Sequence, residues 1–266
     1  MLVRTGRLSH KHDTMHHKLT LIARIMKENE MFLNSRVLRR FFAYLDSDHR
    51  SPIKNSVDQA DAIFNAKLAT LSDTSIAIDC GANVGEISER IAATGATLFC
   101  FEPDDILLPD LIKRLVPYPA ASVFPAAVST NSGTAKLYKS PLYHEDPTKY
   151  SQRNSIRSAA LTRDETDAWM GMDTANTSEV EMINLISFIE GVLGMYGRLD
   201  LLKIDIEGAE VEILEELDHK NLLDSIGLTI AELHEARFPD ELSRISALRS
   251  RLSQRYPSDK VNLDWR

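Results

Sequence analysis

The chain has 266 residues, a formal net charge of −8 and 43% hydrophobic residues, enough for one large core plus an extension. The negative charge argues against nucleic-acid binding, and the two cysteines, Cys80 and Cys100, exclude a disulfide scaffold and favour a reduced, cytoplasmic setting. No apolar run reaches the roughly 18 residues of a membrane helix, and no secretory signal pattern opens the sequence. We therefore expect a cytoplasmic protein without a transmembrane segment.

Residues 1–72 show helical periodicity and predict an N-terminal helical cap, without a catalytic pattern. Residues 1–40 carry nine lysines and arginines and three acids, so nine minus three gives a local charge of +6. This basic stretch is either a solvated helical face or a docking surface for an acidic partner, such as a carrier protein or lipid head groups.

From residue 73 to 266, short apolar runs alternate with amphipathic ones. Such alternation predicts an α/β domain, a parallel sheet with helices on both faces. The predicted strands are 75–80, 97–103, 121–129, 199–208, 228–234 and 261–265, and the predicted helices are 86–94, 105–115, 209–217 and 240–254.

Residues 140–179 interrupt this rhythm with a polar stretch that lacks long apolar periodicity. An insertion of this length in a compact domain is usually functional or disordered, so it is either a lid over the carboxyl edge of the sheet or a mobile surface loop. Its clustered side chains, Tyr143, Tyr150, Arg153 and Asn154, are candidates for binding an acceptor substrate.

The stretch "IAIDCGANVGE" ends a predicted strand on Asp79 and continues into a turn with Gly81, Asn83 and Gly85. Glycines let the backbone bend sharply and let a ligand approach it closely. The turn departs from the nicotinamide fingerprint G-x-G-x-x-G, because Asn83 replaces the middle glycine. Glu102 ends the next strand, where a carboxylate can accept hydrogen bonds from both hydroxyls of a ribose. A ligand with a ribose, no phosphate and a cationic amino-acid end fits best, and S-adenosylmethionine is such a ligand.

The segments "IDCGANVGEIS", "FEP", "AAVSTNSGTAKLY", "LLKIDIEGAEVEIL" and "AELH" occur in the order seen in FkbM-type methyltransferases, so residues 75–235 resemble that family. The resemblance implies a Rossmann-like class I methyltransferase sheet, S-adenosylmethionine as cofactor and, in most members, O-methylation. It places Asp79, Gly81, Asn83 and Gly85 in the cofactor loop, Glu102 on the ribose, and Ala126, Ala127 and Val128 along the adenine. The family sheet usually finishes with two strands after "AELH", whereas this sequence predicts one.

Candidate catalytic residues follow two predicted strands. A period of two puts Lys203, Asp205 and Glu207 on one face, and the next strand ends on Glu232 and His234. His234 is the preferred general base, because its ordinary pKa lies near neutral pH, and Asp205 is the second choice. Asp205 and Glu232 could instead hold Mg²⁺, although the leading interpretation uses no metal. A structural pairing of Asp205 with Lys203 is the plainer alternative.

The sequence thus favours an S-adenosylmethionine-dependent O-methyltransferase acting on a hydroxyl of a sugar, a glycan or a secondary metabolite. A methyltransferase-like binding or assembly module without activity is the alternative, and a nicotinamide-dependent dehydrogenase is a weaker one. The sequence favours no particular acceptor and no oligomeric state.

Overall fold

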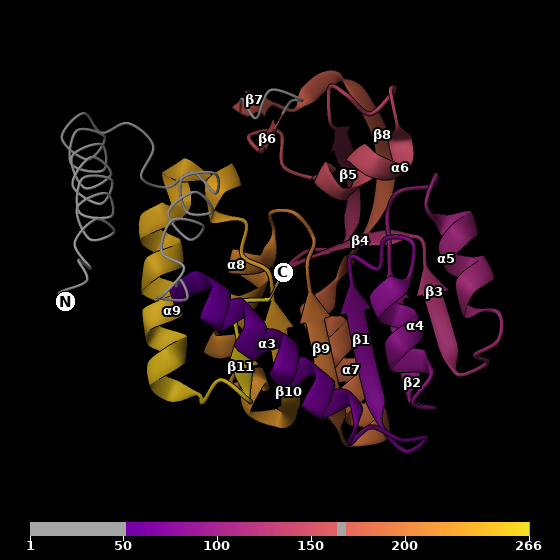
Figure 1. The fold of residues 1–266 in the computed structure, drawn as a ribbon, viewed down its shortest axis with the longest axis vertical. Helices are drawn as coiled ribbons and strands as arrows, with labels where there is room; N and C mark the ends of the chain where they lie inside the picture. Colours follow the sequence, from indigo (N-terminus) through magenta and orange to yellow (C-terminus); the bar gives the residue numbers. More distant parts are fainter. Residues whose placement is uncertain (1–51, 164–168, 266) are drawn as a thin grey trace, which may run out of the picture. The chain divides into compact units, whose positions relative to one another are not determined.

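The computed structural model describes residues 52–163 and 169–265 of the chain. Six strands form a central sheet in which each strand runs parallel to its neighbours (Figure 1). This mixed α/β architecture confirms the predicted Rossmann-like methyltransferase sheet. In spatial order the strands are β11 (Val261–Asn262), β10 (Ile226–Ala231), β9 (Leu199–Ile204), β1 (Ile76–Cys80), β2 (Thr97–Phe101) and β3 (Ala121–Phe124).

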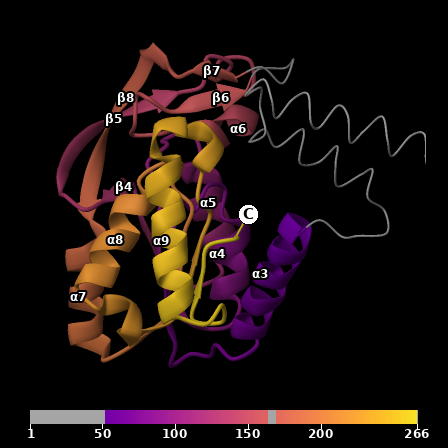
Figure 2. The same cartoon turned by 90° about the vertical axis from the view of Figure 1, so that its left-hand side faces the viewer.

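Helices cover both faces of the central sheet, as the alternating pattern predicts. Phe64, Ile91 and Leu111 belong to the hydrophobic core on one face, and Ile189 and Leu248 belong to the core on the other. Figure 2 shows the two helical layers from the side. The first face carries α3 (Pro52–Leu68), α4 (Glu86–Ala92) and α5 (Leu108–Leu115), and the second carries α7 (Leu185–Tyr196), α8 (Glu210–His219) and α9 (Leu242–Arg255).

Most of the predicted N-terminal cap, including its basic stretch, lies outside the described residues. The described part of that cap is α3, whose Ala60 and Phe64 side chains are fully buried. Phe64 packs edge-on against Trp265, with ring centroids 4.7 Å apart. Helix α3 therefore contributes to the core of the sheet, and residues from Asn55 onward belong to one compact unit.

Burial on both faces explains why β1 reads as a continuous apolar run and not as an alternating one. All five of its residues are buried. Ile76 and Ile78 belong to the core that contains α7, whereas Ala77 belongs to the core that contains α4. A parallel strand covered on both faces has no solvent side on which polar residues would alternate.

The chain leaves the central sheet at Pro125. Residues 121–129 were expected to form one strand, and this prediction is wrong. Phe124 still accepts a hydrogen bond from the backbone N–H of Glu102 at 3.1 Å, but Pro125 has no N–H with which to continue the ladder. The second half forms β4 (Ala126–Ser129), which pairs with another sheet.

This smaller sheet lies beyond the carboxyl edge of the central strands (Figure 1). It joins β4 to β8 (Asp173–Asn184) and β5 (Gly133–Lys139) in the order β4-β8-β5, with β8 parallel to β4 and antiparallel to β5.

The polar segment 140–179 contains regular structure where none was predicted. Its elements are α6 (Pro147–Tyr150), η1 (Ser151–Arg153), β6 (Leu161–Arg163), β7 (Trp169–Gly171) and the first part of β8.

Helix α7 is absent from the sequence prediction, although its ends carry ordinary signals. The Asn184 side chain accepts the backbone N–H of Ser187 at 3.0 Å, and Gly197 ends the helix with φ of 71°. Further along, β11 pairs with β10 and is shorter than the predicted strand 261–265. Short 3₁₀ turns complete the domain: η2 (Leu222–Ser225), η3 (Glu235–Arg237) and η4 (Pro239–Glu241). Among the described helices, none has the length and apolar character needed to cross a membrane.

Candidate active site

The loop between β1 and α4 bends sharply at the carboxyl edge of the central sheet. Gly81, Asn83 and Gly85 adopt left-handed backbone conformations, with φ of 76°, 51° and 87°. The N–H of Gly81 donates to the carbonyl of Phe101 at 3.0 Å, so the loop lies against the end of β2. A Cβ atom at Gly81 would lie 1.8 Å from the backbone oxygen of Asp205. Only glycine fits at this position.

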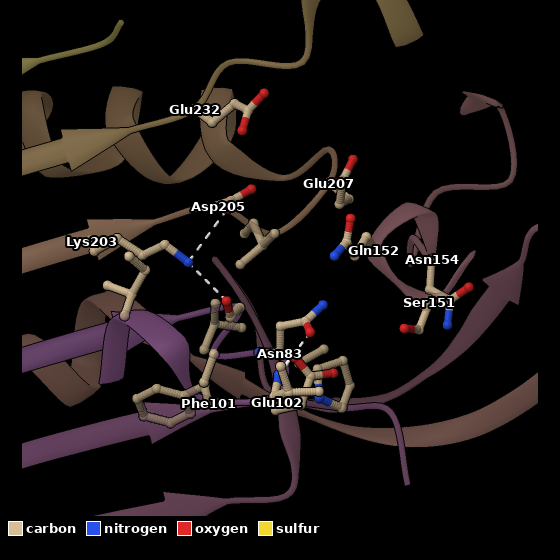
Figure 3. A pocket seen from close by; sticks show the side chains of 18 of the residues that line it. Asn83, Phe101, Glu102, Ser151, Gln152, Asn154, Lys203, Asp205, Glu207 and Glu232 are labelled. Atoms are coloured by element: carbon tan, nitrogen blue, oxygen red, sulfur yellow. Dashed lines mark hydrogen bonds and ion pairs between the residues drawn. The ribbon is translucent and has the colours of Figure 1, made fainter. Parts of the chain in front are cut away.

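Glu102 directly follows β2, and its carboxylate faces the same loop (Figure 3). One carboxylate oxygen accepts the backbone N–H of Asn83 and the other accepts that of Asp104, each at 2.8 Å. Burial raises the pKa of Glu102 to about 7. Each oxygen thus accepts one backbone N–H from the described residues and keeps a lone pair for a further donor.

Lys203 is a buried cation that joins β9 to β1. Its Nζ lies 3.2 Å from Oδ1 of Asp79 and 3.4 Å from Oδ2 of Asp205, and it donates to the carbonyl of Gly81 at 2.8 Å. Ser88 Oγ donates to the other oxygen of Asp79 at 2.6 Å. Burial would lower the pKa of Lys203, but Asp79 and Asp205 outweigh this effect and raise it. Lys203 therefore stays charged, and it fixes both the glycine loop and the Asp205 carboxylate.

Carboxylates that follow β9 and β10 surround the imidazole of His234. Its Nε2 lies 3.0 Å from Glu207 Oε2, 3.7 Å from Asp205 Oδ1 and 3.9 Å from Glu232 Oε1, and its Nδ1 lies 3.0 Å from Glu210 Oε1. The guanidinium of Arg237 also pairs with Glu207. The predicted catalytic residues are thus brought together, as part of a larger ion-pair network.

The charges in this network decide which group can accept a proton. Burial would lower the pKa of His234, but Glu207 and Glu210 outweigh it and raise this pKa well above its usual value. An imidazolium has no free lone pair, so this direction speaks against the preferred choice of His234 as general base, which stays a prediction. Burial raises the pKa of Asp205, against the opposing effect of Lys203. This direction favours Asp205, the second choice, whose role as base likewise stays a prediction.

Glu207 is held in its ionised form. Burial alone would raise its pKa, but His234 and Arg237 outweigh burial and lower it to about 2. Its φ of 63° is left-handed, an uncommon conformation for a non-glycine residue. Glu207 is thus a fixed anion that orients its two cationic partners.

A cavity of about 430 Å³ extends along this edge of the sheet (Figure 3). Among its lining residues are six of the predicted cofactor residues (Gly81, Asn83, Glu102, Ala126, Ala127 and Val128), three of the predicted catalytic residues (Asp205, Glu207 and Glu232) and one predicted substrate residue (Asn154). The volume is typical of a small-molecule site. Residues from the ends of β1, β2, β9 and β10 therefore share one cavity.

Other predicted site residues do not line this cavity: Asp79, Gly85, His234, Tyr143, Tyr150 and Arg153. The Asp79 carboxylate lies behind the loop, where it forms an ion pair with the ammonium group of Lys203. Gly85 begins α4, and a Cβ atom there would lie 2.8 Å from Leu111 of α5. The sequence prediction omitted Phe101, Lys203 and Trp265 from the site, although all three line the cavity. Lys203 could have been assigned to the site from the sequence, because it shares a strand face with Asp205.

Tyr143 and Asn154 attach the inserted segment to the end of β2 through Asp104. The Tyr143 hydroxyl lies 3.1 and 3.2 Å from the two carboxylate oxygens of Asp104, and Asn154 Nδ2 donates to one of them at 2.7 Å. Asp104 is itself buried, and its N–H binds Glu102. The insertion is therefore held directly beside the carboxylate that faces the cavity.

Arg237 holds the insertion from the other side of the cavity. Its Nε donates to the carbonyl of Leu161 at 2.8 Å and its Nη2 donates to that of Arg153 at 2.7 Å, while Nη1 pairs with Glu207. The backbone carbonyl of Arg153 is thus connected to Glu207 through Arg237. Tyr150 is buried under the Arg153 guanidinium, which lies 5.3 Å from its ring centroid.

Asp205, Glu207 and His234 also present donor atoms within 4.8 Å of one another, a spacing that a shared metal ion could use. Each of them already has a partner of opposite charge, because Asp205 binds Lys203, Glu207 binds Arg237 and the imidazolium binds carboxylates. The described residues therefore form an ion-pair network without a metal ion. Mg²⁺ between Asp205 and Glu232 stays a prediction.

The chemistry of the cavity fits S-adenosylmethionine. Glu102 keeps acceptor capacity for ribose hydroxyls, because each of its oxygens accepts one backbone N–H and has a further lone pair. Among the described residues, the charged side chains that line the cavity are five acids (Glu86, Glu102, Asp205, Glu207 and Glu232) and one base, Lys203. This acidic lining suits a cationic sulfonium ligand and opposes a pyrophosphate.

Comparison with known proteins agrees with this geometry. The model of the methyltransferase FkbM domain matches residues 79–256, about two thirds of the chain. Five chains of known structure match; one is a protein from Listeria monocytogenes described as an S-adenosylmethionine dependent methyltransferase. It has 12% sequence identity and a TM-score of 0.22, over 51% of this chain and 80% of that one, a likeness too low to carry an argument. No curated protein matches. On the family match, the chain belongs to the FkbM family of S-adenosylmethionine-dependent methyltransferases.

Proposed function

We propose that the protein transfers the methyl group of S-adenosylmethionine to a hydroxyl group of a sugar, a glycan or a secondary metabolite. The observation that carries the proposal is the placement of Asp205. Its carboxylate lines the cavity directly beside the glycine loop, Lys203 orients it, and burial raises its pKa. A hydroxyl acceptor loses a proton during transfer, and a carboxylate with a raised pKa at that point is suited to accept it.

The cofactor-binding part of the proposal uses the ends of β1 and β2. Glu102 accepts hydrogen bonds from the ribose hydroxyls while Asn83 and Asp104 hold its oxygens in place. The turn at Gly81 leaves the backbone open to the amino-acid end of the cofactor, and Ala127 supplies a small apolar wall for the adenine. Asp79 and Lys203 support the loop from behind.

The acceptor-activating part uses the ends of β9 and β10. When bound, S-adenosylmethionine would supply a methyl group on a sulfonium sulfur: the acceptor oxygen would bond to the methyl carbon, and the sulfur would leave as S-adenosylhomocysteine with the electrons of the broken C–S bond. Asp205 accepts the proton of that hydroxyl group, and Lys203 keeps the carboxylate aimed at the cavity. Glu207 pairs with the cations His234 and Arg237 and so ties the loop after β9 to the segment after β10. Such alignment and proton acceptance account for a large share of a transfer rate.

The test combines binding with transfer. Calorimetric titration with S-adenosylmethionine and S-adenosylhomocysteine is expected to give saturable binding that Glu102→Ala weakens strongly, with NAD as a control that does not bind. Labelled S-adenosylmethionine is then expected to label a hydroxyl in an acceptor panel of sugars and small alcohols. Undiminished binding by Glu102→Ala would refute the cofactor site. Cofactor binding with no transfer to any acceptor would instead support a binding module without activity.

A further inference from the structure

The two ends of the cavity differ in chemistry, and the strand order separates them. Glu102 follows β2 on one side of β1, whereas Glu232 follows β10 on the other side, beyond β9. Glu232 also forms an isolated β-bridge with Asp264, which brings the neighbouring Trp265 to the cavity wall. With the ribose at Glu102, the far end formed by Glu232 and Trp265 is left for the acceptor.

The wall at this far end combines an aromatic surface with hydrogen-bond acceptors. Trp265 packs edge-on against Phe64 and is buried, yet it also lines the cavity, as does Ile87 of α4. Figure 3 shows the carboxylates of Glu232 and Asp205 at the end of the cavity away from Glu102. A hydroxylated ring has an apolar face that an indole can cover and hydroxyl donors that carboxylates can accept.

The charges that line the cavity further restrict the chemical class of the acceptor. Lys203 is the one cationic side chain among the described lining residues, and Asp79, Asp205 and the Gly81 carbonyl already occupy its ammonium. A phosphate or carboxylate on the acceptor would therefore meet acids without a free cation. An amino group would instead be attracted by the carboxylates and by the indole face.

We propose that Trp265, Ile87 and Glu232 form the acceptor subsite, and that this subsite takes a neutral or amine-bearing hydroxylated ring and rejects anionic ones. The proposal rests on the proposed methyl transfer, since it assigns the other end of the cavity to the cofactor. It also moves acceptor recognition away from Tyr143, Tyr150 and Arg153, whose side chains do not line the cavity.

The test observes Trp265 directly. The sequence has two tryptophans, so a Trp169→Phe variant labelled with 5-fluorotryptophan reports on Trp265 alone by ¹⁹F NMR. With S-adenosylhomocysteine bound, we expect methyl glucoside and glucosamine to shift the resonance saturably, and glucuronate and glucose 6-phosphate to bind about tenfold or more weakly. No saturable shift with methyl glucoside or glucosamine, or equal binding of the anionic sugars, would overturn the proposal.

Two variants sharpen the result. Glu232→Gln should strengthen binding of glucuronate relative to methyl glucoside by several fold, a change that a merely structural role would not produce. Trp265→Phe should weaken sugar binding while the affinity for S-adenosylhomocysteine stays within about threefold, and the exposed Tyr196→Phe serves as the matched control. If the unaltered protein does not bind S-adenosylhomocysteine, the proposed function is contradicted. If it binds S-adenosylhomocysteine but no sugar shifts the ¹⁹F resonance of Trp265, only this subsite is contradicted.

Discussion

The Nζ atom of Lys203 lies 3.2 Å from Oδ1 of Asp79, and both side chains are buried. The two residues face each other across the β1–β9 pair, in register. Because Lys203 also binds the Gly81 carbonyl and Asp205, one cation connects the sheet, the glycine loop and the proposed base. Lys203 therefore holds the fold together at the point where the proposed site lies.

Replacing Lys203 by methionine should destabilise the protein strongly, because Asp79 would remain buried without its cation. We expect a loss of about 3–5 kcal/mol in the free energy of unfolding, measured by urea denaturation. Combining Lys203→Met with Asp79→Leu should recover part of that loss, since the buried charge is then removed. Lys220, which pairs with Glu190 at the surface at 2.8 Å, gives the control variant Lys220→Met, for which we expect no measurable loss. An equal loss in both lysine variants would contradict the assignment.

A methyl group at Gly81 should not be tolerated, because it would overlap the backbone oxygen of Asp205 at 1.8 Å and force a left-handed alanine. We expect Gly81→Ala to lower the free energy of unfolding by about 2–6 kcal/mol, from strain and overpacking together. Gly194→Ala in α7 is the control, since a Cβ atom there meets open space and alanine favours a helix by about 1 kcal/mol. Denaturation curves of equal midpoint for the two variants would show that the loop is not so constrained.

Binding of S-adenosylhomocysteine should release a proton near neutral pH. Burial raises the pKa of free Glu102 to about 7, so below that pH the carboxyl is mostly protonated. Ribose hydroxyls donate to the ionised form and lower its pKa in the complex, so the affinity should rise with pH up to about 7, at most tenfold per unit.

Calorimetry in buffers of different ionisation enthalpy measures that release. Glu102→Gln should bind more weakly and release no proton from this position, whereas Asp205→Asn should keep the release due to Glu102. An affinity independent of pH between about 6 and 8 in the unaltered protein would rule out Glu102 as the coupled group.

Asp205→Asn should slow methyl transfer by about 10²- to 10⁴-fold while the affinity for S-adenosylhomocysteine changes little, because the amide keeps the shape but cannot accept the proton. The rate for the unaltered protein should rise with pH through an apparent pKa above the usual range of an aspartate, because burial raises the pKa of Asp205. Single-turnover kinetics across pH measure both effects once an acceptor is found.

The matched variant for that experiment is His234→Gln. The imidazolium stabilises the fold below its raised pKa, and this contribution is lost as pH rises through that pKa. We therefore expect His234→Gln to reduce stability at neutral pH more than at high pH. Normal transfer by Asp205→Asn, together with transfer abolished in a folded His234→Gln protein, would return the role of base to His234.

Local sequence signals predicted the elements that stay within the central sheet. Buried apolar runs marked β1, β2, β9 and β10, and an acid or a glycine at the end of each placed the candidate residues at one edge. The prediction failed where pairing partners lie far apart in the chain. Strand β4 leaves the central sheet at Pro125 to pair with β8, and the polar sequence of β8 shows no apolar periodicity.

The sequence by itself determined the glycine turn, the acid at Glu102 and the gathering of Asp205, Glu207, Glu232 and His234, because carboxyl ends of parallel strands share an edge. Only the tertiary structure shows which charges within that set face one another. Whether His234 is neutral or charged depends on Glu207 and Glu210 at 3.0 Å, and a pKa follows from such distances and from burial. Likewise, only the folded chain brings Trp265 close to Glu232, because residues far apart in the sequence become neighbours when the strands pair.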